Sequence, residues 1–158
     1  MSVTKTVNTS NLDKIMKEIK YLQTHGVRVG IFGEKGNKEN NGVKIIEYAT
    51  YLIVGTSTMP PRDFMQHSIK GKLGRLALAR YQKKVLKDVH KGILTGKEAL
   101  EQIGIEAVQM IKDSISSNDF IPLAESTLKM KANSRNANNI LRDTDQLLDS
   151  VTFTIERL

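Results

Sequence analysis

The segment from Gly92 to Glu98 has the glycines and the lysine that could cradle a phosphate group. Gly92, Gly96 and Lys97 follow the order of a phosphate-binding loop, but the spacing is one residue short. Glu98 also stands where such a loop needs a Ser or Thr to hold magnesium. The segment is better explained as the capped start of a helix.

Two other patterns suggest chemistry and also have simpler explanations. Gly30, Gly33 and Gly36 are evenly spaced by three, which does not match the dinucleotide-binding fingerprint, and no βαβ unit follows. They fit a strand end and a loop. Residues 55–59 lack the second glycine of a nucleophile elbow and run into prolines, so we interpret Ser57 as a turn residue.

Candidate metal ligands and acid–base residues are scattered along the chain. His25, His67 and His90 are isolated from one another and from acidic pairs at ligand spacing. Asp145 and Asp149 share a helical face, and an exposed pair near a helix start explains them. With no Cys there is no thiolate nucleophile, disulfide or Cys-based metal site. We predict that the chain is not an enzyme and uses no metal or cofactor.

The composition fits one ordinary domain. The 158 residues, 39% of them hydrophobic, are enough to bury a core without disulfides or metals, so we expect a single domain over 1–158. The first ten residues have no apolar region, and no apolar run approaches the ~18 residues of a membrane span. We expect a soluble, unprocessed protein with no membrane partner.

The net charge of +7 is unevenly distributed. Residues 1–60 have 8 basic and 5 acidic residues, 61–100 have 10 and 3, and 101–158 have 6 and 9. A basic middle followed by an acidic end could attract copies of the chain head to tail, or could provide one anion-binding surface. Composition does not choose between these.

The first third of the chain predicts a helix, a strand and a second helix. Ser10 is a good N-cap for a helix over Asn11–His25, and Gly26 could end that helix in a left-handed conformation. Apolar residues alternate over Val27–Gly33, as in a half-buried strand. The other expected segments are a mobile, solvated loop over 34–42 and a short helix turning into extended chain over 43–54.

The middle of the chain predicts a helical hairpin. An apolar face and a basic face run along one helix at residues 76–92, after a bend near Gly71 and Gly74. The apolar face contains Leu78, Tyr81, Val85 and Val89, and the basic face contains Arg80, Lys84, Lys87 and Lys91. A capping box at Thr95–Glu98 then begins a second helix that ends near Ser116, antiparallel to the first.

The C-terminal third predicts short elements and a closing strand. A short helix could start within 122–128, and a loop rich in Asn, Ser and charge covers 131–139. A capped helical turn at 143–148 precedes an alternating strand over 150–155. The fold class we predict is α+β: a small antiparallel sheet pairs the N- and C-terminal strands, and long helices cover it.

The basic face has two interpretations. It is either the solvated side of an amphipathic helix or a surface that contacts phosphates or an acidic subunit. Nucleic-acid readers interleave aromatic or base-reading side chains, and here only Tyr81 occurs, on the apolar face. Contact with nucleic acid would therefore be directed at the backbone and sensitive to salt. A small basic nucleic-acid-binding protein is the alternative function.

Three segments together resemble a known family. They are Tyr48–Met65 (YATYLIVGTSTMPPRDFM), Pro122–Lys131 (PLAESTLKMK) and Leu141–Val151 (LRDTDQLLDSV). Their content and order are similar to the motifs of bacteriophage tail-completion proteins, also described as virion-morphogenesis or head–tail joining proteins. Two positions differ from the family pattern: Val54 replaces an acidic residue, and Asp145 replaces a Gly at a turn.

The resemblance implies a structural protein of the virion neck, assembled in the cytoplasm of a bacterial host. It would complete or terminate the tail tube and join it to the head as a ring, by resemblance a hexamer around the DNA channel. Its partners would be copies of itself, the tail tube and head-closure or connector proteins, with non-specific contact to packaged DNA.

The resemblance also implies roles for the motif residues. One group sets the turn that aims the long helix: Gly55, Thr56, Pro60, Pro61 and Arg62. A second group anchors the closing strand: Asp143, Thr144, Leu147 and Ser150. Internal packing and direct partner contact are both open for these side chains.

Overall fold

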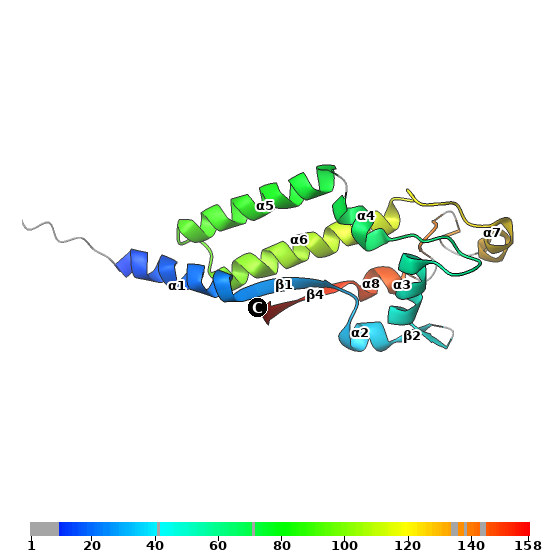
Figure 1. Cartoon of the computed structure of the whole chain (residues 1–158), viewed down its shortest axis with the longest axis horizontal. Coiled ribbons are helices and arrows are strands. Elements are labelled where there is room, and N and C mark those ends of the chain that lie inside the picture. The colour runs from blue at the N-terminus through cyan, green and yellow to red at the C-terminus, as the bar shows by residue number, and fades with distance from the viewer. Residues whose placement is uncertain (1–9, 41, 71, 134–135, 138, 143–144) are drawn as a thin grey trace, which may run out of the picture.

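The computed structural model describes residues 10–158 except 41, 71, 134–135, 138 and 143–144 (Figure 1). Helices dominate the described residues, and the strands form two small antiparallel sheets. The predicted α+β class is confirmed. The elements are α1 (Ser10–Thr24), β1 (His25–Gly30), α2 (Gly33–Asn37), β2 (Glu39–Asn40), β3 (Val43–Lys44), α3 (Ile45–Val54), α4 (Phe64–Lys70), α5 (Lys72–His90), α6 (Gly96–Ser116), α7 (Glu125–Lys131), α8 (Gln146–Ser150) and β4 (Thr152–Arg157).

The larger sheet joins the two ends of the described chain. β1 and β4 pair antiparallel, from His25 opposite Arg157 to Gly30 opposite Thr152. The predicted pairing of N- and C-terminal strands is confirmed. The closing strand begins at Thr152, two residues later than expected, because α8 continues to Ser150.

The two faces of this sheet differ in polarity. Opposite residues on paired strands lie on one face, so Val29 and Phe153 are neighbours. The Phe153 ring packs against α6 at Gly104, where an added Cβ would overlap the ring. On the other face, Arg28 and Glu156 form an exposed ion pair of 3.3 Å. One face therefore packs on α6, and the other carries this exposed ion pair.

α6 begins with the predicted capping box. The Thr95 hydroxyl accepts from the Glu98 N–H at 3.2 Å, and the Thr95 N–H donates to the Glu98 carboxylate at 2.8 Å. The hydrogen bonds from the Thr95 backbone and then its hydroxyl hold the pKa of Glu98 below its usual value. The predicted end of this helix at Ser116 is also confirmed.

α5 and α6 form the predicted antiparallel hairpin, with α6 lying between α5 and the sheet (Figure 1). Val85 and Val89 of α5 are buried together with Ala99 of α6. The connection turns at Gly92, whose φ of 72° is strained for a residue with a side chain. The apolar half of the predicted amphipathic helix therefore forms one of the two cores.

The break before α5 is confirmed. α4 ends at Lys70 and α5 begins at Lys72, while Gly71 lies outside the described residues. Gly74 marks a close approach of the two helices, since a Cβ there would lie 2.5 Å from the Ser68 carbonyl oxygen. A side chain at position 74 would force α4 and α5 apart.

The second core lies where α3, α4, α8 and the end of α6 meet (Figure 1). Phe64 is completely buried at its centre. Its buried members are Ile31, Ile45, Ala49, Leu52, Phe64, Ile111, Ile115, Leu141, Leu147 and Val151. This core brings together residues from both halves of the chain.

The expectations for the first helix and its cap are partly wrong. Gly26 does not end α1 in a left-handed conformation, because α1 stops at Thr24 and Gly26 pairs with Glu156 inside β1. The sequence places Leu12 and Met16 on the apolar face, yet they are 58% and 46% exposed. The start of α1 projects beyond the α5–α6 hairpin, so nothing described there covers them (Figure 1).

The expected loop over 34–42 is wrong for most of its length. The segment forms α2 and then the β2–β3 hairpin, and residue 41 is outside the described residues. Gly36 is buried against Ile31 and Ile46, and the Ile45 N–H donates to the Lys38 carbonyl at 2.9 Å. Tertiary contacts thus order a segment that has almost no apolar residue of its own.

Three other boundaries differ from expectation. The early strand is shifted to 25–30, since Gly33 begins α2. The segment expected to turn into extended chain stays helical to Val54. The loop expected over 131–139 overlaps the end of α7 at Lys131, and residues 134–135 and 138 lie outside the described part.

Gly104→Ala tests the packing of the sheet on α6. The new methyl group would overlap the Phe153 ring, so we expect the free energy of unfolding to fall by about 1–3 kcal/mol despite the better helix propensity of Ala. Urea denaturation measures the change. Phe153→Leu should relieve much of it in the double variant. An unchanged or higher stability for Gly104→Ala would contradict the close approach.

Candidate assembly site

The turn between α3 and α4 contains the first group of motif residues. Gly55 has a φ of 81°, and a Cβ there would lie 2.9 Å from the Met59 carbonyl oxygen. The Thr56 N–H donates to that carbonyl at 2.8 Å, while the Thr56 hydroxyl accepts from the Met59 N–H at 3.1 Å. The turn is therefore closed by Thr56 and needs glycine at its first position.

Arg62 fixes this turn to the rest of the molecule. It is only 3% exposed, its N–H donates to the Leu52 carbonyl at 2.6 Å, and its guanidinium donates to two more carbonyls. Nε lies 2.9 Å from the Ile121 oxygen, and an Nη lies 3.1 Å from the Pro122 oxygen. Among the described residues no carboxylate pairs with it. The buried cation is therefore held by main-chain oxygens.

The residues after Arg62 start α4 and connect it to α6. The Asp63 carboxylate accepts from the Gln66 N–H at 2.8 Å and so caps the helix. The Phe64 carbonyl accepts from the buried Ser114 hydroxyl at 2.9 Å, and Ser114 also lies 3.0 Å from a His67 ring nitrogen. The turn thus leads into the short α4, which packs along α6. That this turn aims a long helix stays a prediction.

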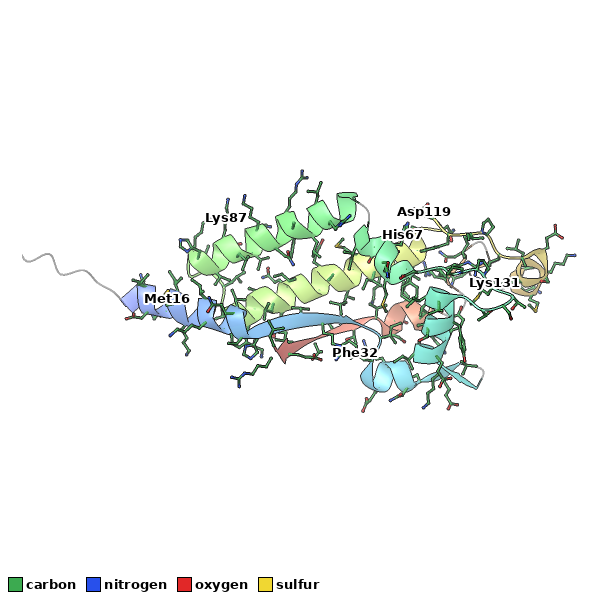
Figure 2. All side chains as sticks on the ribbon, in the orientation of Figure 1. Met16, Phe32, His67, Lys87, Asp119 and Lys131 are labelled. Carbon is green, nitrogen blue, oxygen red and sulfur yellow. The ribbon has the colours of Figure 1, made fainter. Side chains whose placement is uncertain are left out.

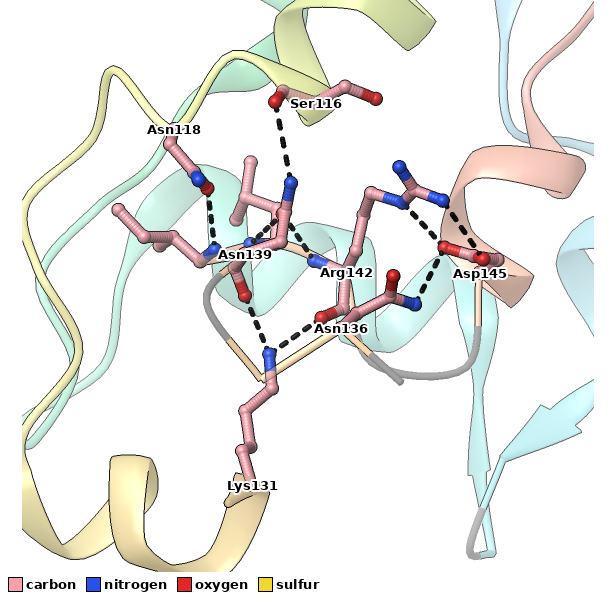
Figure 3. Close-up of polar contacts among 9 residues, drawn as sticks. Ser116, Asn118, Lys131, Asn136, Asn139, Arg142 and Asp145 are labelled. Carbon is pink, nitrogen blue, oxygen red and sulfur yellow. Dashed lines mark hydrogen bonds and ion pairs between the residues drawn. The ribbon is translucent and has the colours of Figure 1, made fainter. Parts of the chain in front are cut away.

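A polar network organises the segment between α7 and α8 (Figure 3). The Asn139 side-chain oxygen accepts from the N–H groups of Leu141 and Arg142 at 3.1 and 2.9 Å. Lys131 donates to the carbonyls of Asn139 and Arg142, each at 2.6 Å. The Lys131 side chain on α7 therefore supplies donors to two main-chain carbonyls in a segment that has no regular secondary structure.

Asp145 has a left-handed backbone conformation. Its φ is 62°, which confirms that Asp takes the turn conformation expected there. Arg142 donates to both carboxylate oxygens of Asp145, at 2.6 and 3.0 Å, and Asn136 donates to one of them (Figure 3). The hydrogen bonds to Asp145 raise the pKa of Arg142. Side-chain contacts thus offset the backbone strain at Asp145.

The other C-terminal motif residues are buried or undescribed. Leu147 is in the second core, and the Ser150 hydroxyl donates to the Gln146 carbonyl at 2.6 Å and lies 3.5 Å from the Lys35 carbonyl oxygen. Asp143 and Thr144 lie outside the described residues. The structure therefore places Leu147 and Ser150 inside the fold, just before β4.

The three motif segments meet around one hollow of about 840 Å³. Its described lining residues include three cations, Arg62, Lys131 and Arg142, but no His, Asp or Glu. The lining is completed by Tyr48, Leu52, Thr58, Met59, Pro60, Pro122, Leu123, Ala124, Ser126, Thr127, Met130, Ile140 and Leu141. Acid–base chemistry would have no carboxylate or imidazole to use among these side chains.

The basic face lies elsewhere. Arg80, Lys84 and Lys87 are exposed on α5, and Lys91 is exposed just after it. Figure 2 shows Lys87 pointing away from α6 into solvent. Among the described residues none of the four side chains has an ion-pair or hydrogen-bond partner. The structure therefore keeps the basic face separate from the motif residues.

Two of the three histidines, His25 and His67, are engaged in local contacts. His25 stacks on Tyr21 with a centroid distance of 4.0 Å, and His67 lies near Phe120 as well as Ser114. Within the described part of the chain, no three His, Asp or Glu side chains gather at a distance suited to a metal. No described helix has the length and apolar character needed to cross a membrane.

Sequence reasoning missed the polar residues that hold the motifs in place. Asn118 accepts from the Ile140 N–H at 2.8 Å, and Asn139 and Lys131 organise the chain around it. Their only sequence signal is the density of Asn and charge in a segment without periodicity. Their partners are main-chain groups far along the chain, which residue types do not identify.

Comparison of the chain with protein-family models, with curated proteins and with solved structures finds no match in any of the three.

Arg62→Met tests the anchoring of the turn. It removes the two charge-assisted hydrogen bonds that the buried guanidinium makes with the carbonyls of Ile121 and Pro122, so we expect a loss of about 3 kcal/mol in the free energy of unfolding. Arg28→Met is the matched control, because the Arg28 ion pair is exposed and should change stability by less than about 1 kcal/mol. Equal losses would contradict the anchoring role.

Proposed function

We propose that this chain is a structural protein of a phage neck, which completes or terminates a tail tube and joins it to the head. It acts by assembling with its own copies into a ring, and not by catalysis. The partners in this proposal are the tail tube and a head-closure or connector protein, and the place of action is the virion.

One observation carries the proposal: the three motif segments, far apart in sequence, converge in space. Arg62 of the first segment binds the carbonyl of Pro122, which opens the second. Leu52 of the first segment shares a core with Leu141 and Leu147 of the third. Residues that resemble one family therefore form one physical unit, which supports treating the resemblance as a property of the whole fold.

The character of the unit supports assembly over catalysis. The motif side chains Arg62 and Ser150 are buried, and both donate to main-chain oxygens. Such contacts determine the directions of α4 and β4, and thereby the surfaces that a neighbour meets. A rigid scaffold with polar loops at one end suits a component whose binding energy comes from repeated contacts.

The test is electron microscopy of phage particles made without this protein. We expect heads and tails that do not join, or tails of abnormal end structure, and we expect purified protein added to such tails to restore joining. Protein with the Arg62→Met substitution should restore less joining than protein with the Arg28→Met substitution, which leaves the anchored turn intact. Normal, head-attached tails in the absence of the protein would contradict the proposal.

The basic face is exposed and has no ion-pair partner within the described part of the chain, which favours a second candidate, binding to the phosphate backbone of nucleic acid. Changing Arg80, Lys84, Lys87 and Lys91 to Glu would abolish salt-dependent DNA binding by an isolated copy if this second function holds. Changing four exposed lysines elsewhere, Lys14, Lys17, Lys20 and Lys44, alters the net charge equally and serves as the control. The neck proposal expects weak DNA binding that both sets reduce alike.

A further inference from the structure

The sheet of β1 and β4 has two open edges. Among the described elements only α6 and α1 pack closely against these strands besides the strands themselves, and α6 covers a face. A sheet of two strands is marginal by itself, and open edges are ready to pair with another chain. Neither strand contains a proline or a bulge that would block such pairing.

The hydrogen-bond pattern identifies the groups that point outward. The Leu158 N–H donates to the Thr24 carbonyl at 2.9 Å, one step beyond the pair His25–Arg157. Hydrogen-bonded and non-hydrogen-bonded pairs alternate along an antiparallel ladder. The pairs that turn their N–H and C=O groups away from each other therefore include Val27–Ile155 and Val29–Phe153. No described hydrogen bond of the chain uses these outward groups.

We propose that the outer edge of β1 in one copy pairs antiparallel with the outer edge of β4 in the next copy. The inference rests on the self-assembly part of the proposed function. Head-to-tail pairing continues the strand order as β4, β1, β4, β1 and satisfies both edges of every copy. Pairing of β4 with β4 about a two-fold axis would leave both β1 edges open, so the geometry favours the head-to-tail arrangement, which can close into a ring.

The side chains fit this arrangement. Val27 and Val29 on β1 face the same side as Phe153 and Ile155 on β4, toward α6. When β1 of one copy pairs with β4 of the next, apolar residues again meet apolar residues on that side. The other side would repeat the exposed Arg28–Glu156 ion pair of each copy.

The dimensions also fit. Two strands span about 10 Å, and an α-helix has a diameter of about 10 Å with neighbours packing at about 8–10 Å. Each copy would therefore advance the sheet by about the width of its own α6. Gly104 faces the sheet and Ile103 faces α5, so Ile105, 61% exposed, points to the flank that a neighbouring copy would cover.

Single-cysteine variants test the proposal without background, because the chain has no Cys. A chain with Arg28→Cys is co-expressed with a differently tagged chain that carries Thr154→Cys. Separate co-expressions replace Thr154→Cys by Thr152→Cys or Glu156→Cys, so that three registers of the β1–β4 pairing between copies are sampled. Across the proposed interface the Arg28 and Thr154 positions form a non-hydrogen-bonded pair with Cα atoms about 4.5 Å apart, which suits a disulfide. Circular dichroism checks that each variant is folded.

We expect a disulfide between differently tagged chains in at least one of the three pairings, and at least tenfold less with Lys17→Cys as the control partner on α1. Thr154→Cys that cross-links to itself, and not to Arg28→Cys, would overturn the head-to-tail arrangement. Rings without any of these disulfides would overturn the edge pairing and leave the proposed function standing. A chain that never self-associates would contradict both.

Discussion

The buried guanidinium of Arg62 is the interaction on which the arrangement of the motif segments depends. It lies between the turn that follows α3 and the chain that leaves α6, and it bonds the carbonyls of Ile121 and Pro122. A buried cation without a carboxylate is destabilising unless polar oxygens surround it. Separating these two segments would therefore leave the guanidinium buried without acceptors and cost free energy. The position of Phe64, the direction of α4 and the hollow beside them follow from this contact.

The regular elements were largely predictable from the sequence. Periodic apolar residues located α5 and α6, the Thr95 capping box located the start of α6, and alternation located the two strands that pair. The errors occur where distant contacts override local patterns. Gly26 has the local signal of a helix cap but pairs within the sheet, and the polar residues of α2 fold because Gly36 packs against Ile31 and Ile46.

The candidate site was predictable only in part. The resemblance implied that Asp145 takes a turn position where Gly is usual, and its φ is positive. The positive φ of Gly55 was not predicted. The network of Lys131, Asn139 and Arg142 was not foreseen, since main-chain carbonyls as partners leave no mark in the sequence (Figure 3). The separation of the basic face from the motifs likewise needed the fold.

Together, a core that contains motif residues, an open two-stranded sheet and a separate basic face support the proposal that the chain works by fitting against its own copies. Sedimentation velocity of the purified protein over a hundredfold range of concentration tests this most directly. The account predicts one closed oligomer and no series of larger oligomers. The resemblance implies six copies of the 17.7 kDa chain in that oligomer. A 17.7 kDa monomer at every concentration would contradict it.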